Sequence, residues 1–178
     1  ILPMARTAAP RLSEADLASL APAAPADELA RVRRLAARGT LGLPLYLDPW
    51  DGYPAARERF YALAREAGAR DLLVLTGDSH SFWSNALHDA AGEPMGLEFG
   101  TTGITSPGDF AKLGRDGARL LDRRLVETNP EVLWTDGLQN GYLRLRLTPA
   151  RAQADYIAVS SVLARDYRLA RLRRLRVG

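Results

Sequence analysis

The run Leu72-Leu73-Val74-Leu75-Thr76 is the feature that most restricts how this chain can fold. It is almost entirely apolar and shows no polar alternation, which is typical of a strand covered on both faces in an α/β sheet. Just before it, Ala56, Phe60, Leu63 and Ala67 recur on one face of an expected helix. The order of the two segments predicts an α/β (α+β) fold, in which helices flank a sheet.

The remaining segments are expected to be short helices and strands. Spacing and breaker residues predict further helices over 14–20, 27–39 and 111–127, and further strands over 41–47 and 95–102. Residues 141–147 alternate apolar and charged side chains, and residues 152–159 can return antiparallel to them, which predicts a C-terminal β-hairpin. The leucines and arginines after residue 162 predict a basic amphipathic helical tail, so that the chain divides into residues 1–162 and 163–178.

Composition excludes several classes of protein. The chain has 178 residues, of which 47% are hydrophobic and 25% charged, as in ordinary globular domains. A formal charge of +3 is too small to indicate a nucleic-acid partner, and none is expected. The chain contains no cysteine, which excludes disulfides and thiolate ligands. No run approaches the roughly 18 consecutive apolar residues that a membrane helix needs, so no membrane span is expected.

Two residues of ligand type, Asp78 and His80, follow the apolar run within Gly77-Asp78-Ser79-His80. In extended backbone, positions i and i+2 project to the same side, so the carboxylate and the imidazole can converge on one cation. Gly77 is expected to let the backbone turn sharply or approach a ligand closely. The spacing alone leaves another interpretation open, in which His80 is a hydrogen-bonded turn residue and Asp78 caps the next segment.

Residues 73–85 resemble the last metal-binding motif of the PhoD-like (alkaline phosphatase D) family, a strand ending in Gly-Asp-x-His-x-x-x-Ala/Ser-Asn. Three further blocks resemble the family in the same order, and the resemblance covers roughly residues 45–160. These blocks are Trp50-Asp51-Gly52-Tyr53 with Arg57, Glu98-Phe99 leading into Ile104-Thr105-Ser106-Pro107-Gly108, and Gly141-Tyr142.

The resemblance implies a partial metallophosphatase-type β-sandwich that hydrolyses phosphate monoesters or diesters with iron and calcium, in an exported (periplasmic or secreted) protein. It makes Asp78 and His80 catalytic metal ligands. Asp51 is a further candidate ligand, although a role in stabilising its own turn is at least as well supported. The family takes its other ligands from upstream motifs, and no comparable acidic, Tyr or Cys cluster precedes Asp51. The chain is therefore expected to be a fragment that is nearly inactive without the missing upstream part.

Two other functions are weighed against this one. Gly77-Asp78-Ser79-His80 also fits the Gly-Asp-Ser block of lipase-like serine esterases, with Ser79 as nucleophile, but His88 is the only other histidine and lies too early to be the usual base. The basic C-terminal segment suits a membrane surface or a partner helix, which would make the chain an inactive fragment or a binding module. The simpler interpretation is a helix that packs its leucines on the domain and leaves its arginines in solvent.

Overall fold

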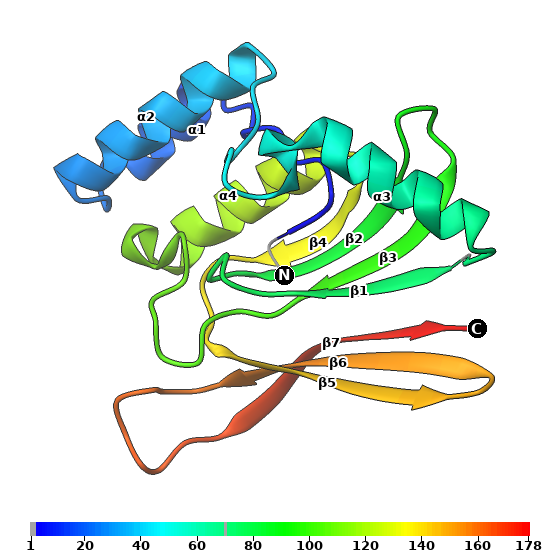
Figure 1. Ribbon diagram of the computed structural model, residues 1–178. Coiled ribbons are helices and arrows are strands. Elements are labelled where there is room, and N and C mark those ends of the chain that lie inside the picture. The colour runs from blue at the N-terminus through cyan, green and yellow to red at the C-terminus, as the bar shows by residue number, and fades with distance from the viewer. Residues whose placement is uncertain (1–2, 70) are drawn as a thin grey trace.

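Two β-sheets pack face to face in the computed structural model, which describes residues 3–69 and 71–178 (Figure 1). The first sheet has the order β1-β3-β2-β4, with β1 parallel to β3 and the other neighbours antiparallel. The second sheet has the order β5-β6-β7 and is antiparallel throughout. The strands are β1 (Leu72–Thr76), β2 (Phe82–His88), β3 (Pro94–Gly100), β4 (Val132–Asp136), β5 (Gly141–Thr148), β6 (Arg151–Val159) and β7 (Leu169–Val177). The expected mixed α/β class is confirmed.

The helices lie on the side of the first sheet that faces away from the second sheet (Figure 1). They are α1 (Glu14–Leu20), α2 (Ala26–Thr40), α3 (Pro54–Glu66) and α4 (Gly114–Thr128), with short 3-10 turns η1 (Trp50–Gly52) and η2 (Ala111–Leu113). Helices α1 and α2 lie outside α4 (Figure 1). All four helices were expected from the sequence. None of the helices in the described part of the chain is long and apolar enough to cross a lipid bilayer.

Apolar clusters join these layers. Between the sheets, Phe82 and Phe99 of the first pack against Ala154 and Tyr156 of the second. The ring of Tyr156 meets that of Phe82 edge-on, with centroids 5.6 Å apart. A separate cluster joins α2 and α4 to the helix-facing side of the sheet, where Trp83 is buried.

The structure differs from the sequence predictions at two strands of the first sheet and at residues 41–47. Strands β2 and β4 were not predicted. Strand β2 is buried on both faces and carries fully buried Ser84 and Asn85, so it shows neither alternation nor an apolar run. The expected strand at 41–47 is wrong. Only the isolated bridge between Ala8 and Pro44 forms there, because Pro44 cannot donate a ladder hydrogen bond.

Strand β1 and helix α3 are also less covered than their sequences predict. On β1, Val74 is buried, but Leu73 and Leu75 are 37% and 47% exposed, so covering on both faces is wrong. The register aligns β1 with β3 along its whole length. Helix α3 buries Arg57 and Tyr61, whereas the predicted apolar stripe through Phe60 and Leu63 is exposed.

The C-terminal segment is a strand, so the predicted basic helical tail is wrong. Strand β7 pairs with β6 from Leu169 to Val177, with an irregularity opposite Tyr156/Ile157. A bulge inserts one residue, so leucines three apart at 172 and 175 can both pack on the core between the sheets. That spacing imitates a helix in the sequence.

Arginines of the second sheet are bound to a buried carboxylate. Asp155 on β6 is 1% exposed and accepts hydrogen bonds from Arg174 (2.5 and 3.1 Å) and Arg144 (2.9 Å). Between the two sheets, the guanidinium of Arg173 on β7 lies 5.6 Å from the ring centroid of Trp134 on β4. These arginine side chains therefore make stabilising contacts within the fold.

The backbone N–H groups of segment 4–8 are bound by side chains, while its pairing with residues 43–45 is limited to one bridge and the hydrogen bond from the Leu45 N–H to the Thr7 carbonyl (2.7 Å). Its five successive backbone N–H groups each donate to a side-chain oxygen, at 2.6–2.9 Å. The acceptors are Glu98 for Met4 and Ala5, Glu131 for Arg6, Asp51 for Thr7, and Asn129 for Ala8. Buried donors left unpaired would be costly, so these acceptors fix the path of the segment.

Replacing Glu98 should destabilise the whole chain. Glu98→Ala removes the acceptor for the Met4 and Ala5 N–H groups and for the Asn85 amide. We expect the free energy of unfolding to fall by about 3 kcal/mol or more, since three buried donors lose their acceptor and each unsatisfied donor costs about 1–3 kcal/mol. Urea denaturation measures the change, with the exposed Glu66→Ala as matched control. Equal stability of the two variants would contradict this role.

Stability should also depend on Asp155 in a pH-dependent way. Hydrogen bonds from Arg174 and then Arg144 hold the pKa of Asp155 well below its usual range. A lowered folded-state pKa contributes stability above the unfolded pKa of about 4, and that contribution is lost as the pH falls toward the folded value. Asp155→Asn should therefore lower the urea midpoint strongly at pH 7 and less at pH 2, whereas the exposed Asp166→Asn should change it little. A pH-independent difference would refute this account.

Candidate active site

The loop after β1 places Asp78 and His80 through left-handed backbone. Asp78 has φ 70° and His80 has φ 51°. The extended geometry assumed from the sequence is therefore wrong for these residues. Aspartate and histidine tolerate this region better than most residues do, yet two such residues in one loop still store some strain. Strain of this kind is typical of loops whose side chains must point in a set direction.

Gly77 does not have the role expected from the sequence. Its φ is not among the positive values, and an added Cβ would meet only Thr101 Cγ2, at an ordinary 3.7 Å. The close approach occurs instead at Gly108, where a Cβ would lie 2.4 Å from the carbonyl oxygen of Gly137. Gly108 therefore lets the loop after β3 pack on the loop after β4.

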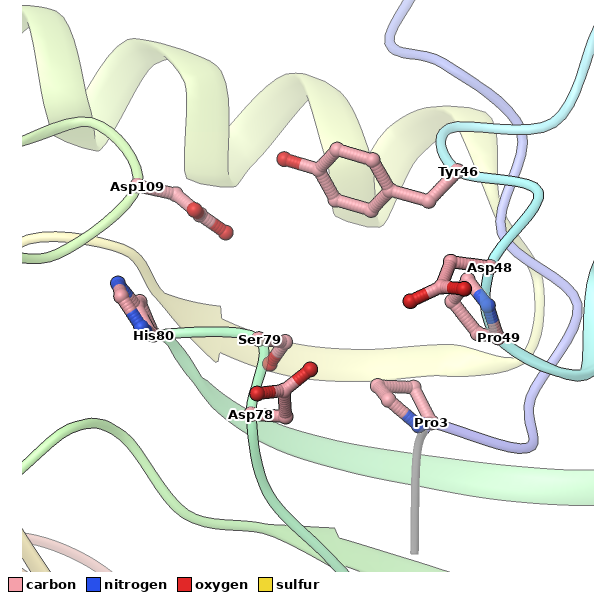
Figure 2. Close-up of a pocket in the computed structure, with 8 residues that line it drawn as sticks. All are labelled: Pro3, Tyr46, Asp48, Pro49, Asp78, Ser79, His80 and Asp109. Atoms are coloured by element: carbon pink, nitrogen blue, oxygen red, sulfur yellow. The ribbon is translucent and has the colours of Figure 1, made fainter.

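Asp78 and His80 line the same pocket, which has a volume of about 260 Å³. Figure 2 shows side chains converging on it from loops that are distant in the sequence. The lining residues are Pro3, Tyr46, Asp48, Pro49, Asp78, Ser79, His80 and Asp109. Asp78 and His80 were expected together from the sequence, whereas Tyr46, Asp48 and Asp109 were not.

The imidazole of His80 is oriented by a backbone carbonyl. Its Nδ1 lies 3.2 Å from the oxygen of Pro107, and Thr102 Oγ1 donates to the His80 carbonyl at 3.0 Å. A carbonyl only accepts, so the Nδ1 contact is a hydrogen bond when Nδ1 carries the proton. In that tautomer the lone pair is on Nε2, which is the usual arrangement of a histidine that binds a metal.

Asp109 and Tyr46 form the wall opposite Asp78 (Figure 2). Burial raises the pKa of Asp109, while a hydrogen bond from Ser81 Oγ at 3.2 Å opposes that rise. Burial, and then the nearby Asp109, raise the pKa of Tyr46 to about 12, so its phenol keeps its proton at neutral pH. The only hints in the sequence were their places beside two family blocks, Tyr46 and Asp48 just before Trp50 and Asp109 just after Gly108.

Asp51 is directed away from this pocket. Its Oδ2 accepts hydrogen bonds from the backbone N–H of Thr7 (2.7 Å) and the Thr7 hydroxyl (3.2 Å), and its Oδ1 pairs with Arg57 at 2.8 Å. It does not line the pocket that holds Asp78 and His80. These contacts favour the structural alternative over metal ligation, although the partner is the N-terminal segment and not its own turn.

Ser79 has no activated hydroxyl in this geometry. Its Oγ accepts a hydrogen bond from Trp83 Nε1 at 2.8 Å and lies 3.5 Å from the Ser81 carbonyl oxygen. His80 is turned to Pro107, and His88 lies 3.8 Å from Glu131 at the other end of β2. A serine nucleophile needs a histidine base within hydrogen-bond reach, so the contacts disfavour the esterase alternative.

The donors of the pocket suit a cation. Carboxylates of Asp48, Asp78 and Asp109 and one imidazole line it, and these are ligand types for iron, manganese, calcium or zinc. Within residues 3–69 and 71–178, however, no three His, Asp or Glu side chains come close enough together to hold a metal ion. The residues thus fit part of a coordination sphere.

Known proteins are similar to this chain in sequence and fold. The model of a family described as PhoD-like phosphatase matches residues 11–156. Alkaline phosphatase D of Bacillus subtilis (strain 168) is 36% identical over 123 residues, which are 66% of this chain and 20% of that protein. A solved structure titled "Structure of PhoD" superposes with a TM-score of 0.62 at 29% identity, covering 75% of this chain and 26% of the other. The chain spans about a fifth to a quarter of the length of these relatives, and it belongs to the PhoD-like phosphatase family.

Proposed function

We propose that this chain takes part in metal-dependent hydrolysis of phosphate esters, with Asp78 and His80 as metal ligands. The observation that carries the proposal is their position on one pocket, with His80 Nδ1 turned to a carbonyl and Nε2 left for a cation. Family membership supports phosphoester hydrolysis as the reaction class. The shared pocket and the orientation of the imidazole support Asp78 and His80 as the metal ligands for that reaction.

The charge of the pocket supports a dependence on cations. Three carboxylates line a space of about 260 Å³, and a phosphate ester is itself an anion. Without a cation, the substrate and the pocket repel each other, and a low-dielectric wall strengthens that repulsion. Bound cations would neutralise the phosphoryl oxygens and lower the pKa of an attacking water. By the family resemblance, we propose iron and calcium as those cations.

The site needs ligands beyond those of this chain. Asp78 and His80 are two donors, and two protein ligands hold a metal weakly and leave its orientation unset. The relatives are several times longer than the part that matches here. We propose that the other ligands come from that further part, that the chain alone has almost no activity, and that the complete protein is exported.

The two histidines of the chain allow a direct test of the ligand assignment. Mn²⁺ added to the purified chain should broaden the NMR signals of the His80 ring at lower concentrations than those of His88, because only His80 lines the pocket. Asp78→Asn keeps a residue that tolerates φ 70° and should weaken this effect at least about tenfold, or about 1.4 kcal/mol. His88→Gln, outside the pocket, should leave it unchanged.

Two results would contradict the proposal. Equal broadening of both histidines, or no change in Asp78→Asn, would refute the shared cation site. Hydrolysis of a chromogenic phosphate ester by the chain alone, at enzymatic rates and with added metal, would refute the need for further ligands.

A further inference from the structure

Asn140 contacts a loop that is distant from it in the sequence. It lies between β4 and β5, directly before Gly141. Its side-chain Nδ2 donates to the carbonyl oxygens of Gly103 (3.0 Å) and Ser106 (2.6 Å). Its own carbonyl accepts from the N–H of Val159 at 3.0 Å, which fixes the residue to β6. Asn140 thus joins the second sheet to the loop after β3.

That loop carries the acceptor for His80. The Ser106 carbonyl belongs to the peptide that precedes Pro107, and the Pro107 carbonyl lies 3.2 Å from His80 Nδ1. The Ser106–Pro107 peptide has no N–H, so its carbonyl is the only polar group by which a partner can hold it. Asn140 holds that carbonyl. One residue therefore separates the Asn140 contact from the group that orients the imidazole.

The end of the loop is fixed independently of Asn140. Phe110 donates its N–H to the carbonyl of Gly137 at 2.9 Å, and Gly108 packs against that same carbonyl. At its start, Thr101 donates to the carbonyl of Thr76 at 2.9 Å. The two Asn140 hydrogen bonds lie between these ends, so their loss should free the middle of the loop without releasing the loop as a whole.

We propose that Asn140 is a positioning residue, which sets the tautomer and direction of the His80 imidazole by holding the loop 103–107. The inference rests on the proposed function in one respect, since the direction of the His80 ring matters for function when His80 binds a metal. Asparagine suits the position because its amide has two N–H donors, and both are used. An aspartate of the same size would place acceptors against two carbonyls.

The neighbour Gln139 provides a matched control. Its Nε2 donates to Asp136 Oδ2 at 3.0 Å, and its backbone N–H donates to Asp136 Oδ1 at 2.9 Å. Gln139 therefore serves the turn itself. Gln139→Ala disturbs the same segment as Asn140→Ala but leaves the loop 103–107 and its contacts in place.

The test is the tautomer of neutral His80 in the metal-free full chain, read from imidazole nitrogen NMR at about pH 8.5, which is about two units above the ordinary histidine pKa. The unmodified chain and Gln139→Ala should both show His80 mainly protonated on Nδ1. In Asn140→Ala and Asn140→Asp, the Nδ1-protonated fraction should fall by at least about half, and the Mn²⁺ concentration that broadens His80 should rise about tenfold or more. His88 is the internal reference.

Each outcome decides the inference. An unchanged His80 tautomer in either folded variant would overturn it. If both variants unfold, hydrogen exchange of the unmodified chain decides the matter. Both side-chain amide protons of Asn140 should be protected relative to an unstructured asparagine. Unprotected protons would overturn the proposal that Asn140 holds the loop 103–107. If the variants shift the His80 tautomer but the unmodified chain does not bind Mn²⁺, the positioning role of Asn140 is supported and the proposed function is refuted.

Discussion

The rest of the structure depends on the hydrogen bonds that the buried Glu98 carboxylate accepts. This carboxylate lies in the middle of the first sheet, fully buried, and takes hydrogen bonds from the N–H groups of Met4 and Ala5 and from the Asn85 amide. A buried carboxylate is tolerated only when its lone pairs are satisfied. Glu98 and the segment 4–8 therefore require each other, and the segment in turn places Pro3 at the wall of the pocket.

The same segment connects the family blocks to one another. Asp51 binds Thr7, and Arg57 binds both Asp51 and the carbonyl of Met4. The block Trp50-Asp51-Gly52-Tyr53 and the glutamate of Glu98-Phe99 thus form a scaffold around the N-terminal segment. Among the family blocks, the one containing Asp78 and His80 lines the pocket, and Pro107 contacts that block through His80. A motif shared within a family can therefore be structural even when it contains a potential ligand.

The sequence predicted those elements whose periodicity is local. The helices, β1, β3 and the hairpin β5–β6 all follow from spacing within a few residues. Strands β2 and β4 did not, and in β2 burial on both faces removed the alternation that marks a strand. Strand β7 was mistaken for a helix because a bulge gives leucines 172 and 175 a helical spacing. In each case, pairing with another part of the chain overrode the local pattern.

The residues of the candidate site likewise fall into two groups, those that a local motif predicted and those that only folding brings together. Asp78 and His80 are two residues apart and were found from the motif, although their left-handed backbone was not. Tyr46, Asp48 and Asp109 come from loops that meet only after folding, so nothing in local spacing could place them. The partner of Asp51 lies 44 residues away, which is why the sequence suggested its own turn instead, and the partners of Asn140 are similarly distant.

The central claim is that the Asp78 carboxylate and the His80 imidazole hold one cation. Crystals of the chain soaked with Mn²⁺ and measured at the manganese absorption edge test it most directly. The account predicts an anomalous peak in the pocket within ligand distance of an Asp78 oxygen and His80 Nε2. A peak at other residues only, or an ordered but unliganded pair at saturating Mn²⁺, would contradict it.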